Sequence, residues 1–189
     1  MTEGIIKLPN RATDPTVDGS LNQAYMIGGG MYVHDVSGVV KPATCMCAFS
    51  AYASALQSSK TGDATEFTIL YDTEVFDLGG DFASPTFTAP ANGEYLLVMN
   101  CSVGNLNADS YESGEISIVT SNRTYIGGKV AVTAAKTASN QYGFTMTVIA
   151  DMDASDTAHT TVTVDGGTKS VNIAGSVSMV TSFYGYRIA

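Results

Sequence analysis

Hydrophobic and polar residues alternate along most of this chain in short runs, which is the pattern of β-strands rather than of helices. The clearest run is FTMTVIA, residues 144–150, in which apolar side chains alternate with Thr145 and Thr147. Strict alternation of this kind turns one set of side chains into a core and the other toward solvent. The only helical candidate, Ala51 to Lys60, has no cap residue and no 3.6-residue apolar stripe. The pattern therefore predicts an all-β protein.

Strand-like runs follow one another from Thr44 to the C-terminus, separated by Gly, Asn, Asp, Ser and Pro. The first run turns four small or apolar side chains to one face, namely Cys47, Phe49, Ala51 and Ala53. The others are residues 65–78 with a bend at Asp72, 93–104, 114–125, 129–137, 144–150, 159–165, 171–177 and 179–188. We expect the run 114–125 to face water on one side. No helical pattern recurs between the runs, which excludes parallel βαβ units and predicts an antiparallel β-sandwich of the jelly-roll kind.

The N-terminal part of the chain has a different character. Residues 1 to about 23 hold two prolines and a polar run, which predicts an extended arm. A small β-hairpin is expected next, with strands Tyr25–Ile27 and Met31–His34 and a turn at Gly28–Gly30. A phosphate-binding loop is the alternative for three consecutive glycines, but no helix and no Lys-Ser/Thr pair follows them. We therefore predict an arm and hairpin over 1–43 and a jelly-roll domain over 44–189.

The segment FTAPANGEYLLVMN, residues 87–100, combines a turn with a strand that is apolar on both faces. Pro90 and the Asn-Gly pair predict the turn. In the strand, Tyr95 and its alternate neighbours are expected to point toward the opposite sheet, while Leu96 and Val98 point the other way. Burying each of these two side chains stabilises a structure by roughly 1.5–3 kcal/mol. Either neighbouring copies of the chain or a loop or hairpin of the same copy would cover this second face.

Charge and composition limit the partners. Charged residues make up only 14% of the chain and the net charge is −9, against about 25% charged residues in typical soluble domains. An acidic chain of this kind is unsuited to bind nucleic acid or an anionic membrane surface. The N-terminus has no apolar h-region and no run of 18 apolar residues occurs, so we expect neither a secretory signal nor a membrane span.

Histidines and cysteines suggest no chemistry. The chain has two histidines, His34 and His159, and neither accompanies a nucleophile in a G-x-S-x-G turn. Three cysteines, Cys45, Cys47 and Cys101, are an odd number without a disulfide framework or a zinc spacing. We expect reduced thiols in a cytoplasm-like compartment.

Two groups of acidic residues are the remaining candidates for a site. One loop brings together three carboxylates that are able to bind Ca²⁺, namely Asp151, Asp153 and Asp156. Their spacing is not that of an EF-hand, and we interpret them as a solvated turn. One strand end carries a tyrosine and three carboxylates, namely Tyr71, Asp72, Glu74 and Asp77. We interpret this group as a wet strand face rather than as a glycosidase pair. The sequence therefore predicts no enzyme, no catalytic residue, no cofactor and no metal site.

Three segments resemble a known family, the trimeric jelly rolls of complement globular heads and tumour necrosis factor ligands. They are AFSA at Ala48–Ala51, the block Val75–Gly104, and TSFYGYRI at Thr181–Ile188. The positions that match the family pattern are Phe87, Ala89, Pro90, Gly93, Tyr95, Phe183, Gly185 and Tyr186. The resemblance covers residues 44–189 and implies a homotrimer. The residues that it implies for the core or the trimer interface are Tyr95, Leu96, Val98, Phe183, Tyr184 and Tyr186.

The chain departs from the secreted members of this family because it shows no signal peptide and no collagen-like stalk. In this it resembles the versions found in virion proteins of tailed bacteriophages. That resemblance implies a homotrimeric capsid decoration (cement) protein on the virion surface, assembled in the host cytoplasm. Its arm would bind the major capsid protein through Ile5, Ile6, Leu8 and Pro9. A tail-fibre or spike tip that binds a host glycan and a soluble lectin- or cytokine-like ligand are the alternatives.

Overall fold

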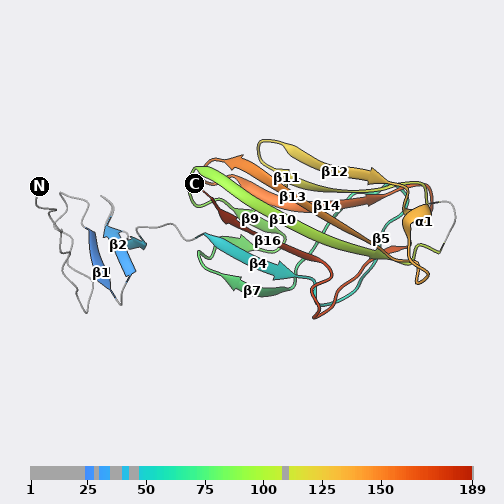
Figure 1. Ribbon diagram of the computed structural model, residues 1–189, viewed down its shortest axis with the longest axis horizontal. Coiled ribbons are helices and arrows are strands. Elements are labelled where there is room, and N and C mark those ends of the chain that lie inside the picture. The colour runs from blue at the N-terminus through green and yellow to red at the C-terminus, as the bar shows by residue number, and fades with distance from the viewer. Residues whose placement is uncertain (1–23, 28–29, 35–39, 43–46, 108–110, 189) are drawn as a thin grey trace, which may run out of the picture. The chain divides into compact units, whose positions relative to one another are not determined.

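The computed structural model describes residues 24–27, 30–34, 40–42, 47–107 and 111–188 (Figure 1). The arm residues predicted to bind a capsid, Ile5, Ile6, Leu8 and Pro9, lie outside these ranges, as does Cys45.

The chain divides into two compact units, Met1–Met46 and Cys47–Ala189. The described part of the first unit is a three-stranded antiparallel sheet of β1 (Ala24–Ile27), β2 (Gly30–His34) and β3 (Val40–Pro42). β1 pairs with β2 so that Ile27 lies opposite Gly30, which confirms the predicted hairpin. β3 was not predicted, because a strand of three residues that ends in a proline is too short to show alternation.

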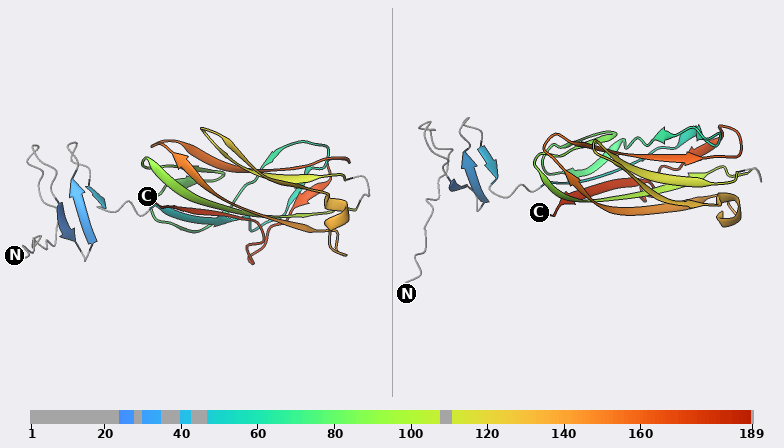
Figure 2. Two further views of the ribbon diagram at one scale, coloured as in Figure 1. Left: turned by 45° about the horizontal axis from the view of Figure 1, so that its top comes forward. Right: turned by 90° about the horizontal axis from the view of Figure 1, so that it is seen from above.

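The second unit is an antiparallel β-sandwich of two sheets, as the alternation predicted (Figures 1 and 2). In sheet order, the larger sheet contains β5 (Gln57–Thr61), β15 (Val171–Ile173), β10 (Gly93–Gly104), β16 (Ser182–Arg187), β4 (Ala48–Tyr52) and β7 (Thr73–Asp77), and β13 (Tyr142–Met152) pairs with β10. The smaller sheet contains β12 (Thr124–Val130), β11 (Gly114–Thr120), β14 (Thr157–Val164), β9 (Thr86–Thr88) and β8 (Phe82–Ala83), and β6 (Phe67–Thr68) pairs with β14.

Aromatic rings fill the core between the two sheets. Phe49 on β4 stacks on Phe87 with ring centroids 4.7 Å apart and on Phe82 at 5.1 Å. It also meets the edge of Phe183 on β16 at 5.0 Å. Offset-stacked and edge-to-face pairs of this kind add about 0.5–1.5 kcal/mol each to the burial of the rings. An aromatic cluster with Phe49 at its centre therefore joins β4 and β16 of the larger sheet to β8 and β9 of the smaller sheet.

Two inward faces predicted from alternation are confirmed. The four side chains of the first run, Cys47, Phe49, Ala51 and Ala53, are all buried. On β13, Phe144 and Ala150 are buried, while Met146 and Val148 pack against the core and are partly buried. The predicted bend at Asp72 is present as a break between β6 and β7, where the Asp72 carboxylate accepts hydrogen bonds from the Ser54 backbone N–H and hydroxyl.

Three predictions about local structure are wrong. The run 171–177 is not one strand, because β15 ends at Ile173 and a loop follows. The run 129–137 is not one strand, because β12 ends at Val130 and a short helix, α1 (Val132–Ala135), follows with Val132 buried. Alanine-rich residues favour this turn of helix once strand pairing has ended. The run 114–125 is not one strand either, because β11 ends at Thr120 and β12 begins at Thr124; on the predicted wet side of β11, Glu115 and Val119 are half-buried and Ser117 is only 4% exposed. Ser117 is small, and its larger cross-strand neighbours Ile126 and Thr161 cover it.

Within the described residues, no helix is long and apolar enough to cross a membrane.

Candidate interaction surface

One face of the larger sheet points away from the core, and we call it the outer face. Strand register arranges its side chains in three rows that run across β13, β10, β16 and β4. In that strand order the rows are Ile149–Leu96–Tyr186–Ala48, Thr147–Val98–Tyr184–Ser50 and Thr145–Asn100–Ser182–Tyr52. The first two rows are largely apolar or aromatic, and the third is mostly polar.

The outer face shows how the doubly apolar strand β10 is covered. Its inward side chains, Tyr95 among them, are fully buried in the core. On the second side, Val98 is only 8% exposed because Thr147 and Tyr184 flank it on the two neighbouring strands. Leu96 is half-buried between its own two neighbours. Large cross-strand side chains of the same copy therefore cover β10, and their outer surfaces are what remains exposed.

Within the three rows, the exposed apolar surface belongs mainly to the larger side chains. Ile149 is 58% exposed, Tyr186 49% and Tyr184 36%. Of the six residues predicted for the core or the trimer interface, Leu96, Val98, Tyr184 and Tyr186 lie on the outer face. Tyr95 and Phe183 lie in the core, where they are out of reach of a second subunit.

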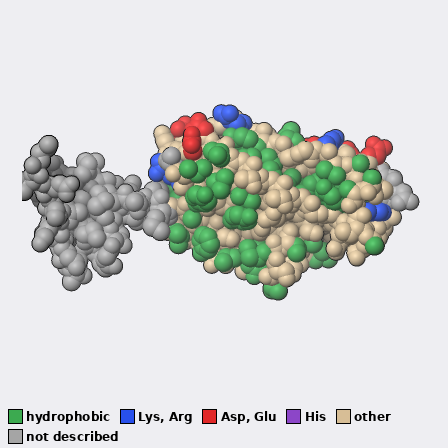
Figure 3. Space-filling view, in the orientation of Figure 1, with side chains coloured by type: hydrophobic (Ala, Val, Ile, Leu, Met, Phe, Trp, Pro, Cys, Tyr) green, Lys and Arg blue, Asp and Glu red, His purple; other side chains and the backbone are tan. Residues whose placement is uncertain are grey.

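The outer face carries no charge in its three rows. Charged residues begin only beyond the first row, where Glu94 on β10 lies opposite Asp151 on β13. Figure 3, which views this side of the domain, shows acidic and basic side chains along the upper border and at both ends, with the centre free of them. A partner that covers these rows removes no charged side chain of this chain from water. Burial of the rows therefore carries no free-energy cost for the desolvation of charge.

A shallow groove of about 340 Å³ lies across β4 and β16 beside β7. Its walls include the rings of Phe76, Tyr184 and Tyr186 and the side chain of Met179. Gly185 belongs to the same stretch of β16 and faces inward. A Cβ atom there would lie 2.7 Å from the Leu96 carbonyl oxygen and 2.8 Å from Leu97 Cδ2. Only glycine lets β16 approach β10 this closely between the two tyrosines of the groove.

Of the acidic residues predicted to form a solvated turn, Asp156 holds the turn through its side chain. The Asp156 carboxylate accepts hydrogen bonds from the Asp153 backbone N–H at 2.8 Å and from the Asn122 side-chain amide at 2.6 Å. Among the described residues, no group of three or more His, Cys, Asp or Glu side chains is placed to hold a metal ion. The predicted turn is confirmed for Asp153 and Asp156, whereas Asp151 belongs to β13 and lies opposite Glu94.

The interpretation of the second acidic group is wrong for one member. Tyr71 is only 1% exposed, and its hydroxyl lies 2.6 Å from Thr160 Oγ1 in the core. Burial raises the pKa of Tyr71 well above its ordinary value, and the bond to Thr160 opposes this only in part. Asp77 accepts four backbone N–H groups of the following turn, from Gly79 to Phe82. Its carboxylate shapes that turn, so this group is not simply a wet strand face.

The described histidine and cysteine side chains form no reactive group. His159 on β14 lies opposite Val119 and is half-buried. Cys47 and Cys101 are buried and form no disulfide. Burial raises the pKa of Cys101 to about 12, so this thiol stays protonated at neutral pH.

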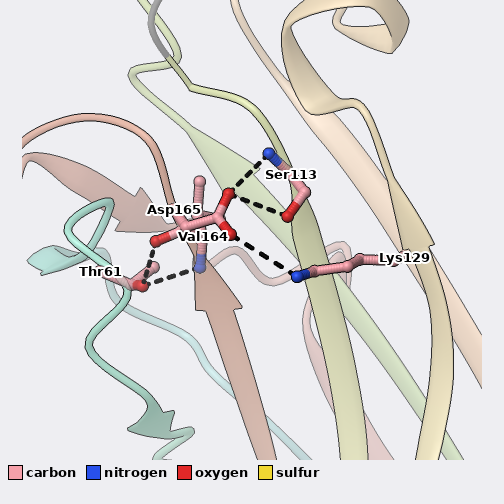
Figure 4. A network of polar contacts seen from close by, with 5 residues as sticks. All are labelled: Thr61, Ser113, Lys129, Val164 and Asp165. Carbon is pink, nitrogen blue, oxygen red and sulfur yellow. Dashed lines mark hydrogen bonds and ion pairs between the residues drawn. The ribbon is translucent and has the colours of Figure 1, made fainter.

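A network of polar contacts surrounds the C-terminal end of β14 in the smaller sheet (Figure 4). Asp165 Oδ1 accepts hydrogen bonds from the backbone N–H and the hydroxyl of Ser113, both at 2.8 Å. Asp165 Oδ2 lies 3.6 Å from Lys129 Nζ. Beside it, Thr61 Oγ1 accepts the Val164 backbone N–H at 2.9 Å. These contacts tie β14 to β11, β12 and β5, and their role is structural.

Three side chains of the surface were not predicted from the sequence: Ile149, Phe76 and Met179. For Ile149 a signal existed, because the alternation that turns Ala150 inward turns its neighbour outward. Phe76 is brought to Tyr184 by the strand order β16-β4-β7 and Met179 by the fold of the loop before β16, and no local pattern encodes either.

No protein-family model and no curated protein matches this chain. Solved structures do match. The globular domain of the zebrafish complement 1qA protein is 14% identical over 76% of this chain and 98% of that chain, with a TM-score of 0.47. Murine APRIL at pH 8.0 is 10% identical over 76% of this chain and 99% of that chain, with a TM-score of 0.51. Murine APRIL at pH 5.0 is 8% identical with the same coverage and a TM-score of 0.50.

The likeness to murine APRIL shows the fold. The second unit of this chain is an antiparallel β-sandwich of the jelly-roll class, and the resemblance to tumour necrosis factor ligands holds at the level of architecture. This likeness of fold does not bear on the predicted bacteriophage origin, which stays a prediction.

Proposed function

We propose that this chain is a non-enzymatic structural protein that assembles into a homotrimer through the outer face of its larger sheet. The observation that carries the proposal is the charge-free outer face with Ile149, Tyr184 and Tyr186 exposed around a groove. Exposed apolar patches of this kind mark contact surfaces. Aromatic and aliphatic side chains at the centre of a patch, surrounded by polar ones, resemble the core and rim of a protein interface.

A cyclic trimer is the arrangement that fits the resemblance stated above. Its contacts are heterologous, so the outer face of one copy meets a different surface of the next, and three contacts close the ring. Covering one large exposed apolar side chain contributes up to about 1.5–3 kcal/mol. The side chains named here therefore supply a substantial share of the free energy of association.

Tyr186→Glu tests the self-association. Glutamate at the rim of the groove places a charge in the proposed contact, and we expect the assembly to dissociate into monomers. Sedimentation velocity at micromolar concentration checks this, with the wild type expected at three times the 19.7-kDa chain mass. Thr124→Glu, at an exposed position of β12 in the opposite sheet, is the control and is expected to remain trimeric. A monomeric wild type would refute the proposal.

The specific role we propose is that of a capsid decoration protein of a tailed phage, assembled in the host cytoplasm and displayed on the virion surface. The division into Met1–Met46 and a separate jelly-roll unit supports it, because an anchor and a displayed domain are then distinct parts of one chain. The anchor would bind the major capsid protein through the arm residues Ile5, Ile6, Leu8 and Pro9. A protein that binds only the assembled shell stabilises it by mass action.

Deletion of residues 1–23 tests the anchoring role. We expect the shortened protein to remain trimeric and to lose attachment to heads, measured by co-sedimentation with particles from the native source. Hundreds of copies on each particle would fit decoration, while a few trimers would indicate the tail-fibre alternative. A shortened protein that still decorates heads would contradict the role of the arm.

A further inference from the structure

A loop between β15 and β16, residues 174–181, projects from the body of the second unit (Figures 1 and 2). At its tip Val177 is 82% exposed, and Val180 is 39% exposed. The sequence from Val171 to Tyr186 contains no charged residue. An apolar side chain with this exposure on an uncharged loop is the opposite of the polar tips that loops normally present.

The loop is held in place by backbone contacts. The Ser176 backbone N–H donates to the Ala53 carbonyl at 2.9 Å, and the Met179 N–H donates to the Ser176 carbonyl at 2.9 Å. Gly175 packs so closely that an added Cβ would lie 2.0 Å from the Ala55 carbonyl oxygen. Because these contacts order the loop in a single copy, little conformational entropy remains to be lost when Val177 is buried by a partner.

Leu56 extends this apolar surface. It follows Ala55, on which the loop packs, and is 57% exposed. Val177, Val180 and Leu56 therefore come from two adjoining segments that project aliphatic side chains into solvent, and we call these three side chains the loop patch. Met179 of the same loop lines the groove on the outer face, so the loop patch and the groove border one another.

We propose that the loop patch of one copy inserts Val177 into the groove of the next copy, between Tyr184, Tyr186 and Phe76. This proposal rests on the proposed self-association and specifies which surface meets the outer face. A heterologous ring requires two different surfaces on every chain. The chain presents both a concave, aromatic, uncharged surface and a projecting, aliphatic, uncharged one. Because they border one another, a rotation about an axis beside that border brings the loop of one copy over the groove of the next.

The test has two parts, and the first uses single substitutions in the full chain. Val177→Asp is expected to weaken self-association at least about 100-fold, because it buries an unpaired carboxylate in the groove. Ile126→Asp is the matched control, since Ile126 is 62% exposed on β12 of the opposite sheet. Sedimentation velocity reads the mass, and circular dichroism confirms that both variants fold, as expected for exposed sites.

The second part identifies the contact by a disulfide. Val177→Cys and Phe76→Cys are made separately, Phe76 being a groove residue that is 45% exposed. Oxidation of the mixture is expected to give a covalent dimer of the two variants that neither gives alone. The absence of this dimer, or a Val177→Asp protein that remains trimeric as Ile126→Asp does, would overturn the inference while leaving the trimer intact. A monomeric wild type would instead overturn the proposed function itself.

Discussion

Replacing Phe49 by alanine is expected to reduce the free energy of unfolding of this protein by about 3–5 kcal/mol. The ring is 2% exposed and stands at the centre of the aromatic cluster, with three other rings within 5.1 Å of its centroid. Its removal takes away apolar burial, three ring contacts and the bridge between β4 and the smaller sheet. The three surrounding rings, Phe82, Phe87 and Phe183, belong to three different strands, β8, β9 and β16, and are too constrained to close the cavity. Urea denaturation followed by tyrosine fluorescence measures the change.

Leu78→Ala is the comparison for this prediction. Leu78 follows β7 and is 57% exposed, so its truncation is expected to change the free energy of unfolding by less than about 0.5 kcal/mol. A Phe49→Ala protein that unfolds at the same urea concentration as Leu78→Ala would show that the aromatic cluster does not hold the sandwich together.

The inward faces of the strands could be predicted from sequence because a period of two residues is a local property. Phe49 and Phe144 lie inside for the reason that the alternation gave, and β10 spans the predicted residues 93–104. Tyr71 was assigned to a wet face because carboxylates follow it, yet the break at Asp72 changes which side the chain presents. A bend interrupts the alternation, and the residues on its two sides can no longer be assigned from one pattern.

The candidate surface could be predicted only in part. Alternation alone placed Leu96 and Val98 on the second side of β10, where the structure has them. It did not show that Val98 is covered by Tyr184 and Thr147 of the same copy, because that depends on which strands flank β10. The groove depends on strand order in the same way. What remains exposed is therefore the outer layer of Ile149, Tyr184 and Tyr186 rather than the central strand itself.

Because the exposed side chains belong to the strands beside β10 rather than to β10 itself, the proposed assembly is not required for the single copy to fold. A fully exposed Leu96 and Val98 would make the single copy unstable without partners. Because cross-strand neighbours already shield both residues, one copy is able to fold first and associate afterwards through surface that it can tolerate exposing. Association is then expected to depend on protein concentration, without unfolding of the dissociated chains.

Replacing Asp165 by alanine is expected to destabilise the protein by about 2–4 kcal/mol at neutral pH, because two hydrogen bonds to a charged group are lost and the Ser113 N–H is left without its acceptor. Desolvation acts to raise the pKa of this carboxyl, but the bonds from Ser113 and the nearby Lys129 lower it overall. A carboxyl whose pKa is lower in the folded state contributes stability above its unfolded pKa and loses that contribution as pH falls through the folded pKa.

The difference in unfolding free energy between wild type and Asp165→Ala is therefore expected to be largest near pH 7 and to shrink as the pH falls below the ordinary range of aspartate. Urea titrations at a series of pH values measure it. Asp153→Ala, at an exposed carboxylate in the turn between β13 and β14, is the control and is expected to show little effect at any pH. A constant difference between wild type and Asp165→Ala across the series would mean that the carboxylate contributes by packing rather than by its charge.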